Sequence, residues 1–417
     1  MKHVHAVIGA GWGDEGKGLA VDALAASLGG DVVVVRSNGG AQAGHGVHTP
    51  DGRHHVFHHI GAGSFTGART HLSRFFVAHP MVFFTEIEAL KAKGLVPGLS
   101  MDPRSQITTH WDMAINQSLE FLRGDGRHGS CGLGFGETLE RSEAGFGLTF
   151  EDLHSDDLQQ RLEHIRDAWV KPRLAALDLL DRDYPLKDIL TGKVEMLDIF
   201  MADCLKFSEA ITIARDADIS KADAVIFEGA QGLRLDMDLG EFPHVTRSLT
   251  GLPNVVAIAR EAGIEMIDVT YMTRTYGTRH GAGPMPYELG LDEPGFAKVI
   301  DLTNAPNEWQ GRIRYGELDL TGLKNIIQRD LARIEGQGVT CNAGLGITCI
   351  DQLRAPVDMM LDDLPLTLEI EDVDDVLPRV LELPLHLASW GPHRGKVSLE
   401  RIPVGPALDL GNLAPSG

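Results

Sequence analysis

The sequence contains few cysteines, few basic residues and no long apolar run. Its 417 residues include four cysteines, whose spacing fits neither a zinc site nor a disulfide framework, so we expect a reducing, cytoplasmic setting. Lysine and arginine number 38 against 59 acidic residues, and the formal net charge of −21 argues against a broad nucleic-acid surface. No apolar run reaches the roughly 18 residues of a membrane span, and the N-terminus lacks a secretory signal. We therefore expect no nucleic-acid partner and no membrane.

Short apolar runs separated by glycine-rich turns predict an α/β fold. Residues 5–8 form a strand pattern, residues 9–18 a glycine-rich turn, residues 19–28 a helical pattern and residues 31–36 a second apolar run. Two strands joined by a helix predict a parallel βαβ unit. Further strand candidates are residues 224–227, 255–258, 266–269, 347–350 and 384–387.

The charge-rich stretch over residues 151–180 has apolar residues at helical spacing, which predicts exposed helices in an inserted lobe. No flexible linker is present. The sequence therefore predicts a single domain over residues 1–417, with a helical insertion at about residues 100–220. The fold class is α/β, with a large, mostly parallel central sheet flanked by helices and with inserted helical and loop subdomains.

A glycine-rich loop, Gly-Trp-Gly-Asp-Glu-Gly-Lys-Gly at residues 11–18, joins the first strand to the first helix. Backbone N–H groups, the helix N-terminus and Lys17 can together hold a phosphate. Because the chain is acidic overall, local donors of this kind must bind any anionic substrate. The acidic pair inside the loop makes sense if Asp14 ligates Mg²⁺ or transfers a proton. Otherwise Asp14 and Glu15 are only charges at a helix N-terminus.

Two other loops and an arginine pair also suggest a site. Residues 38–45 are glycine-rich and end in His45, which suits general acid catalysis, or else is a surface histidine. Residues 227–232, FEGAQG, follow a buried strand candidate and by themselves predict a tight turn. Arg312 and Arg314 can clamp carboxylates through paired donors, or else form a solvated pair.

Taken in order, these motifs resemble the adenylosuccinate synthetase family over residues 5 to about 395. Residues 12–18, WGDEGKG, resemble the family's opening signature, and residues 227–246 resemble its FEGAQG segment through PxVT. Residues 38–45 are similar to GGHNAGH, with Gln42 replacing Asn. Residues 278–286 are similar to TRVGxGPFP, residues 307–319 to the loop ending in GRPRR, and residues 347–351 to LTKLD, with Cys349 replacing Lys. Residues 129–141 resemble the TTGxGIGP loop, with Cys131 replacing Thr.

The resemblance implies a role for each matching residue. Catalysis would use Asp14, Lys17, His45 and Gln231. The GTP site would comprise Glu15, Gly16, Lys17, Gly18, Asp351, Ser389, Gly391 and Pro392. The purine monophosphate site would comprise Asp14, Gln42, Cys131, Arg141, Gln231 and Thr246, with Arg141 reaching across a dimer interface. Aspartate would bind Gln310, Arg312 and Arg314, and Mg²⁺ would bind Asp14 and the carbonyl of Gly44.

The resemblance also implies a reaction. A ligase of this family couples L-aspartate to C6 of a 6-oxopurine nucleoside monophosphate, here IMP, through a 6-phosphoryl intermediate. It uses GTP, or ATP given Cys349, gives adenylosuccinate, and acts as a homodimer. One alternative is the same chemistry on GMP or dGMP, suggested by Gln42, Cys131 and Arg247. Another is a nucleotide-binding regulator without catalysis, against which the retained Asp14 and His45 argue.

Overall fold

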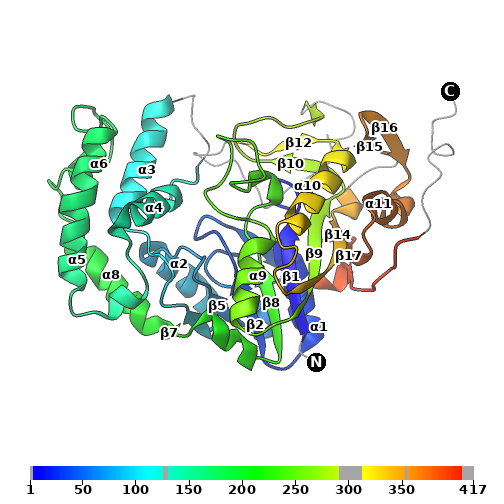
Figure 1. The fold of residues 1–417 in the computed structure, drawn as a ribbon, viewed down its shortest axis with the longest axis horizontal. Helices are drawn as coiled ribbons and strands as arrows, with labels where there is room; N and C mark the ends of the chain where they lie inside the picture. The colour runs from blue at the N-terminus through cyan, green and yellow to red at the C-terminus, as the bar shows by residue number, and fades with distance from the viewer. Residues whose placement is uncertain (1–2, 125–129, 291–311, 353–355, 406–417) are drawn as a thin grey trace.

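A ten-stranded sheet forms the centre of the chain in a computed structural model that describes residues 3–124, 130–290, 312–352 and 356–405 (Figure 1). Its strand order is β18-β17-β14-β9-β1-β8-β2-β5-β6-β7, and only the β17–β18 pair is antiparallel. In chain order the strands are β1 (His3–Gly9), β2 (Val32–Arg36), β5 (Arg69–Leu72), β6 (Leu99–Met101), β7 (Thr212–Ile213), β8 (Ala224–Glu228), β9 (Met266–Arg274), β14 (Thr340–Thr348), β17 (Leu385–Ser389) and β18 (Val397–Ser398). The predicted α/β class and mostly parallel sheet are confirmed.

Both faces of this sheet are covered. Along β2, Val32 and Val34 belong to the apolar core on one face, whereas Val33 and Val35 belong to the core on the other. Successive side chains of a strand point to opposite faces, so a strand buried on both sides has a continuous apolar sequence. This explains the uninterrupted valine run of residues 32–35.

The helices that cover the sheet lie at its two faces and in a lobe (Figure 1). They are α1 (Lys17–Leu28), α2 (Pro80–Lys91), α9 (Leu252–Glu261), α10 (Leu320–Ala332) and α11 (Val373–Leu381). The predicted strand at residues 255–258 is wrong, because this run lies within α9. Pro253 falls in the first turn of α9, where proline is well tolerated, and the helix has one buried side and one side with the exposed Arg260 and Glu261. A run of four apolar residues is too short to tell the buried side of a helix from a buried strand.

The lobe, at the left of Figure 1, consists mainly of helices. These are α3 (His110–Arg123), α4 (Phe135–Arg141), α5 (Leu158–Ile165), α6 (Lys171–Ala176), α7 (Lys187–Leu190) and α8 (Leu197–Ala210). The helices predicted over residues 151–180 are confirmed by α5 and α6. The ring of Phe207 on α8 packs edge-on against Phe83 on α2, with centroids 4.8 Å apart. The lobe therefore shares one apolar core with a face of the sheet.

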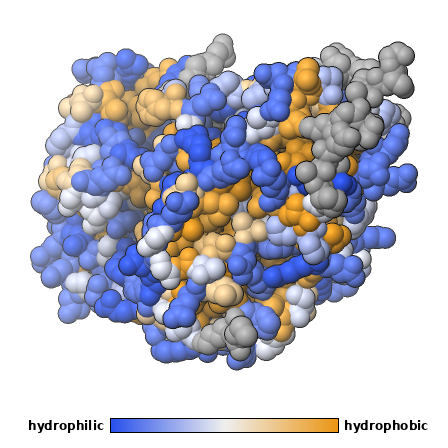
Figure 2. Space-filling view, turned by 45° about the vertical axis from the view of Figure 1, so that its right-hand side comes forward, coloured by the Kyte–Doolittle hydropathy of each residue, from blue (hydrophilic) through white to orange (hydrophobic). Residues whose placement is uncertain are grey.

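Smaller sheets lie beside the main one. They contain β3 (His45–His48) with β4 (His54–Phe57), β10 (Gly277–Arg279) with β11 (Glu288–Leu289) and β12 (Arg314–Gly316), and β13 (Leu318–Asp319) with β15 (Val357–Leu361) and β16 (Leu364–Leu368). Figure 2 shows apolar side chains gathered near the middle of one face, among hydrophilic residues. Among the helices that the structure describes, none is both long and apolar enough to cross a bilayer.

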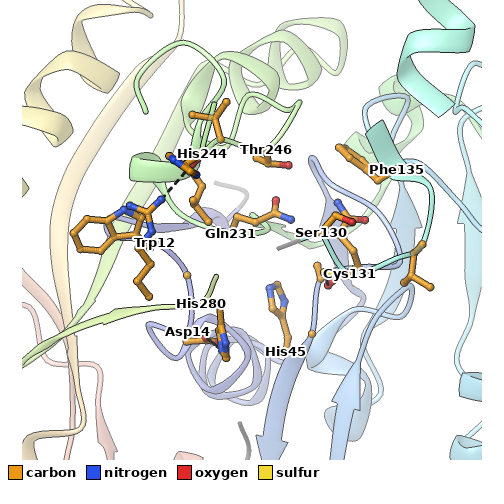
Figure 3. Close-up of a pocket in the computed structure, with 18 of the residues that line it drawn as sticks. Trp12, Asp14, His45, Ser130, Cys131, Phe135, Gln231, His244, Thr246 and His280 are labelled. Carbon is orange, nitrogen blue, oxygen red and sulfur yellow. Dashed lines mark hydrogen bonds and ion pairs between the residues drawn. The ribbon is translucent and has the colours of Figure 1, made fainter. Parts of the chain in front are cut away.

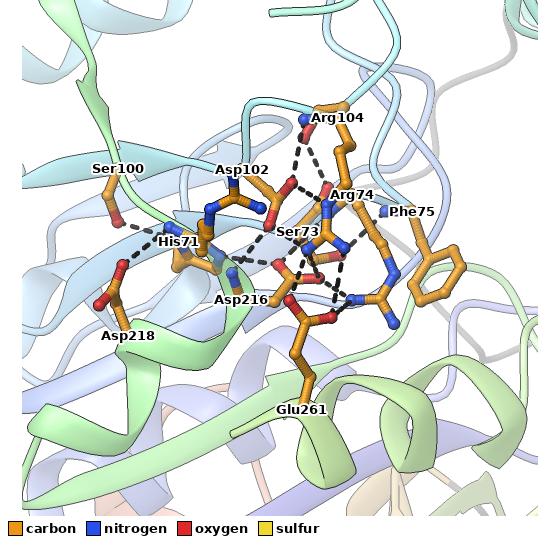
Figure 4. A network of polar contacts seen from close by, with 12 residues as sticks. His71, Ser73, Arg74, Phe75, Ser100, Asp102, Arg104, Asp216, Asp218 and Glu261 are labelled. Atoms are coloured by element: carbon orange, nitrogen blue, oxygen red, sulfur yellow. Dashed lines mark hydrogen bonds and ion pairs between the residues drawn. The ribbon is translucent and has the colours of Figure 1, made fainter. Parts of the chain in front are cut away.

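A network of charges ties the carboxyl ends of β5 and β6 to α9 (Figure 4). The buried Asp216 accepts from Arg74 at 2.7 Å, and its own N–H donates to the buried Asp102 at 2.8 Å. Arg104 joins Asp102 to Glu261 at the end of α9, at 2.7 and 2.8 Å. These groups satisfy one another, so the network stabilises the sheet edge by compensating its buried carboxylates.

Candidate active site

A cavity of about 700 Å³ opens at the carboxyl ends of β1, β2 and β8, where the loops that follow these strands meet (Figure 3). In open parallel sheets this edge is the usual position of a ligand site, and the volume suits a small molecule. Its lining includes many of the residues singled out from the sequence: Asp14, Glu15, Gly16, Lys17, Gly18, Gln42, Gly44, His45, Cys131, Gln231 and Thr246. The fold therefore brings motifs far apart in the chain into one site.

The loop between β1 and α1 is shaped by Glu15. Its carboxylate accepts from the N–H groups of Gly11 and Gly13, at 2.9 and 2.8 Å, and from Nζ of Lys17 at 2.9 Å. Gly16, the N-cap of α1, has φ of 82°, and a Cβ there would lie 2.8 Å from Cγ2 of Thr348. Only glycine meets both demands without strain. The helix N-terminus and Lys17 thus remain at the cavity, where both attract an anion.

Asp14 lies in this loop at the floor of the cavity. Its backbone has φ of 62°, and its carbonyl accepts from Nε of Arg274. Its Oδ2 lies 2.9 Å from Nε2 of His280. Burial by itself would raise the pKa of Asp14, but the hydrogen bond and charge of His280, with Arg274 and Lys17, hold that pKa below its ordinary value. Asp14 is therefore an ionised carboxylate that can accept a proton.

His45 projects into the cavity from the start of β3 (Figure 3). Its Nδ1 lies 2.5 Å from Oε1 of Glu228, and Oε2 of Glu228 lies 3.1 Å from Nη1 of Arg36. A contact this short to a carboxylate requires a proton between the two atoms, so Nδ1 donates and Nε2 is left for the cavity. Burial lowers the pKa of His45 to about 4, even though Glu228 opposes that shift. Glu228 therefore orients the imidazole and favours its protonated form, whereas burial favours the neutral form.

The same family is found by comparison with known proteins. The family model described as adenylosuccinate synthetase matches residues 6–331. This chain belongs to the adenylosuccinate synthetase family. Family membership makes it a C–N ligase of purine biosynthesis, in agreement with the function implied by its motifs.

Relatives and solved structures extend the match along the chain. The adenylosuccinate synthetase of Anaeromyxobacter dehalogenans strain 2CP-1 is 31% identical, over 95% of this chain and 92% of its own. That of Xylella fastidiosa is 33% identical, over 83% and 77%. The fold is similar to fully ligated adenylosuccinate synthetase from Plasmodium falciparum, with a TM-score of 0.72, 19% identity and coverage of 95% and 100%. It is also similar to succinoaminodeoxyadenylate synthetase of cyanophage S-2L bound to dGMP and dATP, with a TM-score of 0.61, 16% identity and coverage of 96% and 95%.

Two amide side chains in the cavity of this adenylosuccinate synthetase family member have polar atoms without a hydrogen-bond partner among the described residues. These buried atoms are Oε1 of Gln231 and Nε2 of Gln42. Gln231 has φ of 58° in the turn after β8, which Asn38 fixes by bonding both the N–H and the carbonyl of Ala230. Buried polar atoms are normally paired, so these two are available to a polar ligand. Cys131 lines the cavity as a neutral thiol, because burial raises its pKa to about 11.

The structure does not bring Arg141 to the cavity. Its guanidinium is completely buried, pairs with Asp112 at 2.9 Å, and donates to the carbonyls of Ile107 and Phe146 at 2.8 and 2.6 Å. All of these contacts lie within its own chain. The prediction that Arg141 reaches a nucleotide across a dimer interface therefore does not fit this structure, and the residue instead anchors α4 to α3.

The predicted aspartate and base-binding residues also lie outside the cavity lining. Arg312 is exposed, whereas Arg314 pairs with Glu288 through Nε at 2.7 Å; Gln310 falls outside the described residues. Asp351 is exposed just after β14, and Ser389 ends β17, the strand beside β14. The Ser389 hydroxyl donates to the carbonyl of Gly391 at 2.8 Å, and the exposed Pro392 follows.

Several residues in or next to the cavity lining were given no role from the sequence. Arg36 and Glu228 hold His45, and the only sequence signal for them is a charged residue at the end of a buried strand. The guanidinium carbons of Arg234 and Arg279 lie 4.5 and 5.5 Å from the centroid of the Trp12 ring. Arg247, named in the sequence only as a departure from the family pattern, pairs with Glu140 and Glu143 at 2.7 and 2.6 Å. These pairings depend on tertiary contacts that sequence spacing does not encode.

Proposed function

We propose that this chain couples L-aspartate to C6 of IMP, with GTP as the energy donor, and forms adenylosuccinate, GDP and phosphate. The proposal rests on one observation: the loops that follow β1, β2 and β8 place Asp14, Lys17, His45 and Gln231 around one cavity. An ionised carboxylate, a cation at a helix N-terminus and an oriented imidazole are the groups that phosphorylation of a purine oxygen requires.

The first step is phosphoryl transfer to O6. Asp14 takes the proton from N1 of the purine, and the electron pair of the N1–H bond moves toward O6. O6 then attacks the γ-phosphorus of GTP, while the bond between the γ-phosphorus and the bridging oxygen breaks and GDP leaves. Lys17 and the N-terminus of α1 stabilise the charge on the transferring group, which is mainly a matter of positioning and electrostatics. His45 stabilises the developing charge at O6 by donating from Nε2 in its doubly protonated form, whose charge the Glu228 carboxylate beside Nδ1 compensates.

The second step replaces the phosphorylated oxygen. The aspartate amine attacks C6 and loses a proton, and the C6–O6 bond breaks to release phosphate. Phosphate is a far better leaving group than hydroxide, which explains why a triphosphate is consumed. Gln231, whose Oε1 lacks a partner among the described residues, contacts the purine nucleotide in this arrangement.

The residues present fit Mg²⁺, which prefers oxygen ligands and usually keeps several waters or substrate phosphates. Asp14 and Gly44 both line the cavity, so a carboxylate and a carbonyl are available there. We assign these two residues as its protein ligands, and Mg²⁺ would neutralise charge on the phosphate oxygens. Among the described residues no group of three or more histidine, cysteine or acidic side chains could hold a metal by itself, which suits an ion held largely by substrate.

The remaining substrate contacts are assigned from the family pattern. Gln42, Cys131 and Thr246 line the cavity and would contact the purine monophosphate. Glu15, Gly16, Lys17 and Gly18 would hold the GTP phosphates, and Asp351, Ser389, Gly391 and Pro392 would hold its guanine. Gln310, Arg312 and Arg314 would bind the carboxylates of aspartate, and Arg314 is paired with Glu288 in the structure.

The family also suggests the wider setting of the enzyme: we infer a homodimer acting in the cytoplasm, built as a single domain with the helical lobe inserted. The GMP or dGMP alternative is not favoured, because Asp14 is retained, whereas phage-type enzymes that act on a guanine nucleotide often have a small residue there to admit the 2-amino group. The regulator alternative is not adopted either, because Asp14, Lys17 and His45 are all present in the cavity.

The proposal is tested by phosphate release from purified protein. We expect release from GTP only when IMP, aspartate and Mg²⁺ are all present. Asp14→Asn should reduce the rate by orders of magnitude, since asparagine tolerates the left-handed backbone but cannot accept the proton. Release that does not depend on aspartate, or an Asp14→Asn variant with normal turnover, would overturn the proposal.

A further inference from the structure

His280 contacts the carboxylate that the proposed reaction uses as its base. Nε2 of His280 lies 2.9 Å from Oδ2 of Asp14, and both residues line the cavity, at its floor in Figure 3. The family motif that residues 278–286 resemble has valine at this position, which offers no nitrogen to a carboxylate. The contact therefore has no counterpart in that motif.

The backbone around Asp14 is fixed independently of His280. Arg274 donates to the Asp14 carbonyl, and the Glu15 carboxylate holds the N–H of Gly13. These contacts set the position of the Asp14 Cα atom and its φ of 62°. They do not set the rotation of the carboxylate about χ1 and χ2, on which proton transfer depends.

The loop that carries His280 is also fixed. His280 follows β10, an antiparallel neighbour of β12 in which Arg279 lies opposite Arg314 in the strand register. Nη1 of Arg314 donates to the carbonyls of Gly281 and Gly283, at 3.1 and 2.8 Å, so the loop is held immediately beyond His280. Gly283 has φ of +107°, and a Cβ there would clash with the Arg279 guanidinium and the His244 ring. The imidazole therefore reaches Asp14 from a rigid support.

We propose that His280 is a positioning residue, which donates Nε2–H to Oδ2 of Asp14 and so directs Oδ1 toward the N1 proton of the purine. This inference rests on the proposed function. A carboxylate held through one oxygen loses most of its rotational freedom, while the other oxygen accepts the proton and the remaining lone pairs of the carboxylate are left for Mg²⁺. Arg314 acts indirectly, by holding the loop on which His280 lies.

Three substitutions at His280 separate this role from a merely structural one. Glutamine places its side-chain N–H near the position of Nε2, asparagine places its N–H near that of Nδ1, and valine restores the residue of the family motif. We expect His280→Val and His280→Asn to lower kcat by about 10- to 100-fold, the size of effect that a small misplacement of a reacting group produces. His280→Gln should stay within about threefold of the unsubstituted enzyme, because the donor to Oδ2 is kept.

The other readouts should not change. The KM for GTP, the melting temperature and the calorimetric affinity for IMP should be the same in all three variants, because His280 is partly exposed and contacts neither nucleotide in the proposed site. The proposal would be overturned by a normal kcat in His280→Val, by an equal loss of kcat in all three variants, or by a change in KM without a change in kcat. If the unsubstituted enzyme forms no succinyl product at all, the proposed function fails instead, so the two failures are distinguishable.

Discussion

The Nδ1 atom of His45 lies 2.5 Å from Oε1 of Glu228, and the second oxygen of that carboxylate lies 3.1 Å from the guanidinium of Arg36. Glu228 and Arg36 are both completely buried. Glu228 therefore has two roles: it orients the imidazole toward the cavity, and it compensates a cation that has no access to solvent. The two roles predict different results for different substitutions.

Glu228→Gln should lower kcat by about 10- to 100-fold with a smaller loss of stability, because the amide can still accept from Nδ1 but no longer stabilises a charged imidazole. Glu228→Ala should lower the free energy of unfolding by about 3–5 kcal/mol, since it leaves a buried arginine uncompensated. Urea denaturation and steady-state kinetics measure both. As a control, Asp31→Asn breaks the exposed pair with Arg69 and should cost under about 1 kcal/mol. Equal losses in Glu228→Ala and Asp31→Asn would contradict the assigned role.

Arg312→Leu should raise the KM for aspartate by about tenfold or more and leave the KM for both nucleotides nearly unchanged. A charge-assisted hydrogen bond contributes about 1.5–3 kcal/mol, which corresponds to about a tenfold to hundredfold change in affinity. The exposed Arg260 on α9 offers a matched control, and Arg260→Leu should change none of the three constants. An unchanged KM for aspartate in Arg312→Leu would show that Arg312 does not bind the carboxylate of aspartate.

Asp351→Asn should weaken the use of GTP and narrow the difference between GTP and ATP. A carboxylate at this position accepts from N1–H and the 2-amino group of guanine, whereas adenine offers neither donor. Asp351 is exposed in the structure, and a bound base that covers its carboxylate without donating to it costs about 1–3 kcal/mol, so we expect about a tenfold to hundredfold preference for GTP. Cys349 in place of lysine removes stacking surface, which favours the lower end of that range. Equal kcat/KM for GTP and ATP in the unsubstituted enzyme would show that Asp351 does not recognise the base.

The buried histidines predict a loss of stability in acid. Burial lowers the pKa of His5, His45, His79 and His110 to about 4, from 6.5. Between these two pH values the unfolded chain binds protons that the folded chain does not, so the free energy of unfolding falls as pH decreases from about 6.5 to about 4. Above pH 6.5 these groups contribute no pH dependence.

His79 isolates this effect from catalysis. It is 1% exposed, and neither ring nitrogen has a hydrogen-bond partner among the described residues. His79→Leu removes the titrating group but keeps an apolar side chain, so its free energy of unfolding should fall less steeply between pH 6.5 and 4. Denaturant titrations at several pH values measure the slope. If the free energies of unfolding of the two proteins fall equally between pH 6.5 and 4, His79 has the same pKa in the folded and the unfolded chain.

The sequence was sufficient to predict the first βαβ unit, because its valine run and glycine-rich turn have few other interpretations. It was not sufficient for residues 255–258, since a four-residue apolar run is common to the buried side of a helix and to a buried strand. The family resemblance assigns Arg141 to the nucleotide, but the residue pairs with Asp112 on another helix. Nothing in the sequence gives His280 a role, because its contact with Asp14 depends on how β10 is placed beside the first loop. Residues that act through tertiary pairing were thus the ones that sequence patterns missed.

The central claim is tested most directly by mass detection of the product. Purified enzyme is incubated with aspartate, Mg²⁺ and each of IMP, GMP and dGMP, against GTP and ATP in turn. IMP with GTP should give the succinyl adduct of the purine nucleotide, with one phosphate released for each adduct formed. An adduct formed only from GMP or dGMP, or no adduct from any combination, would contradict it.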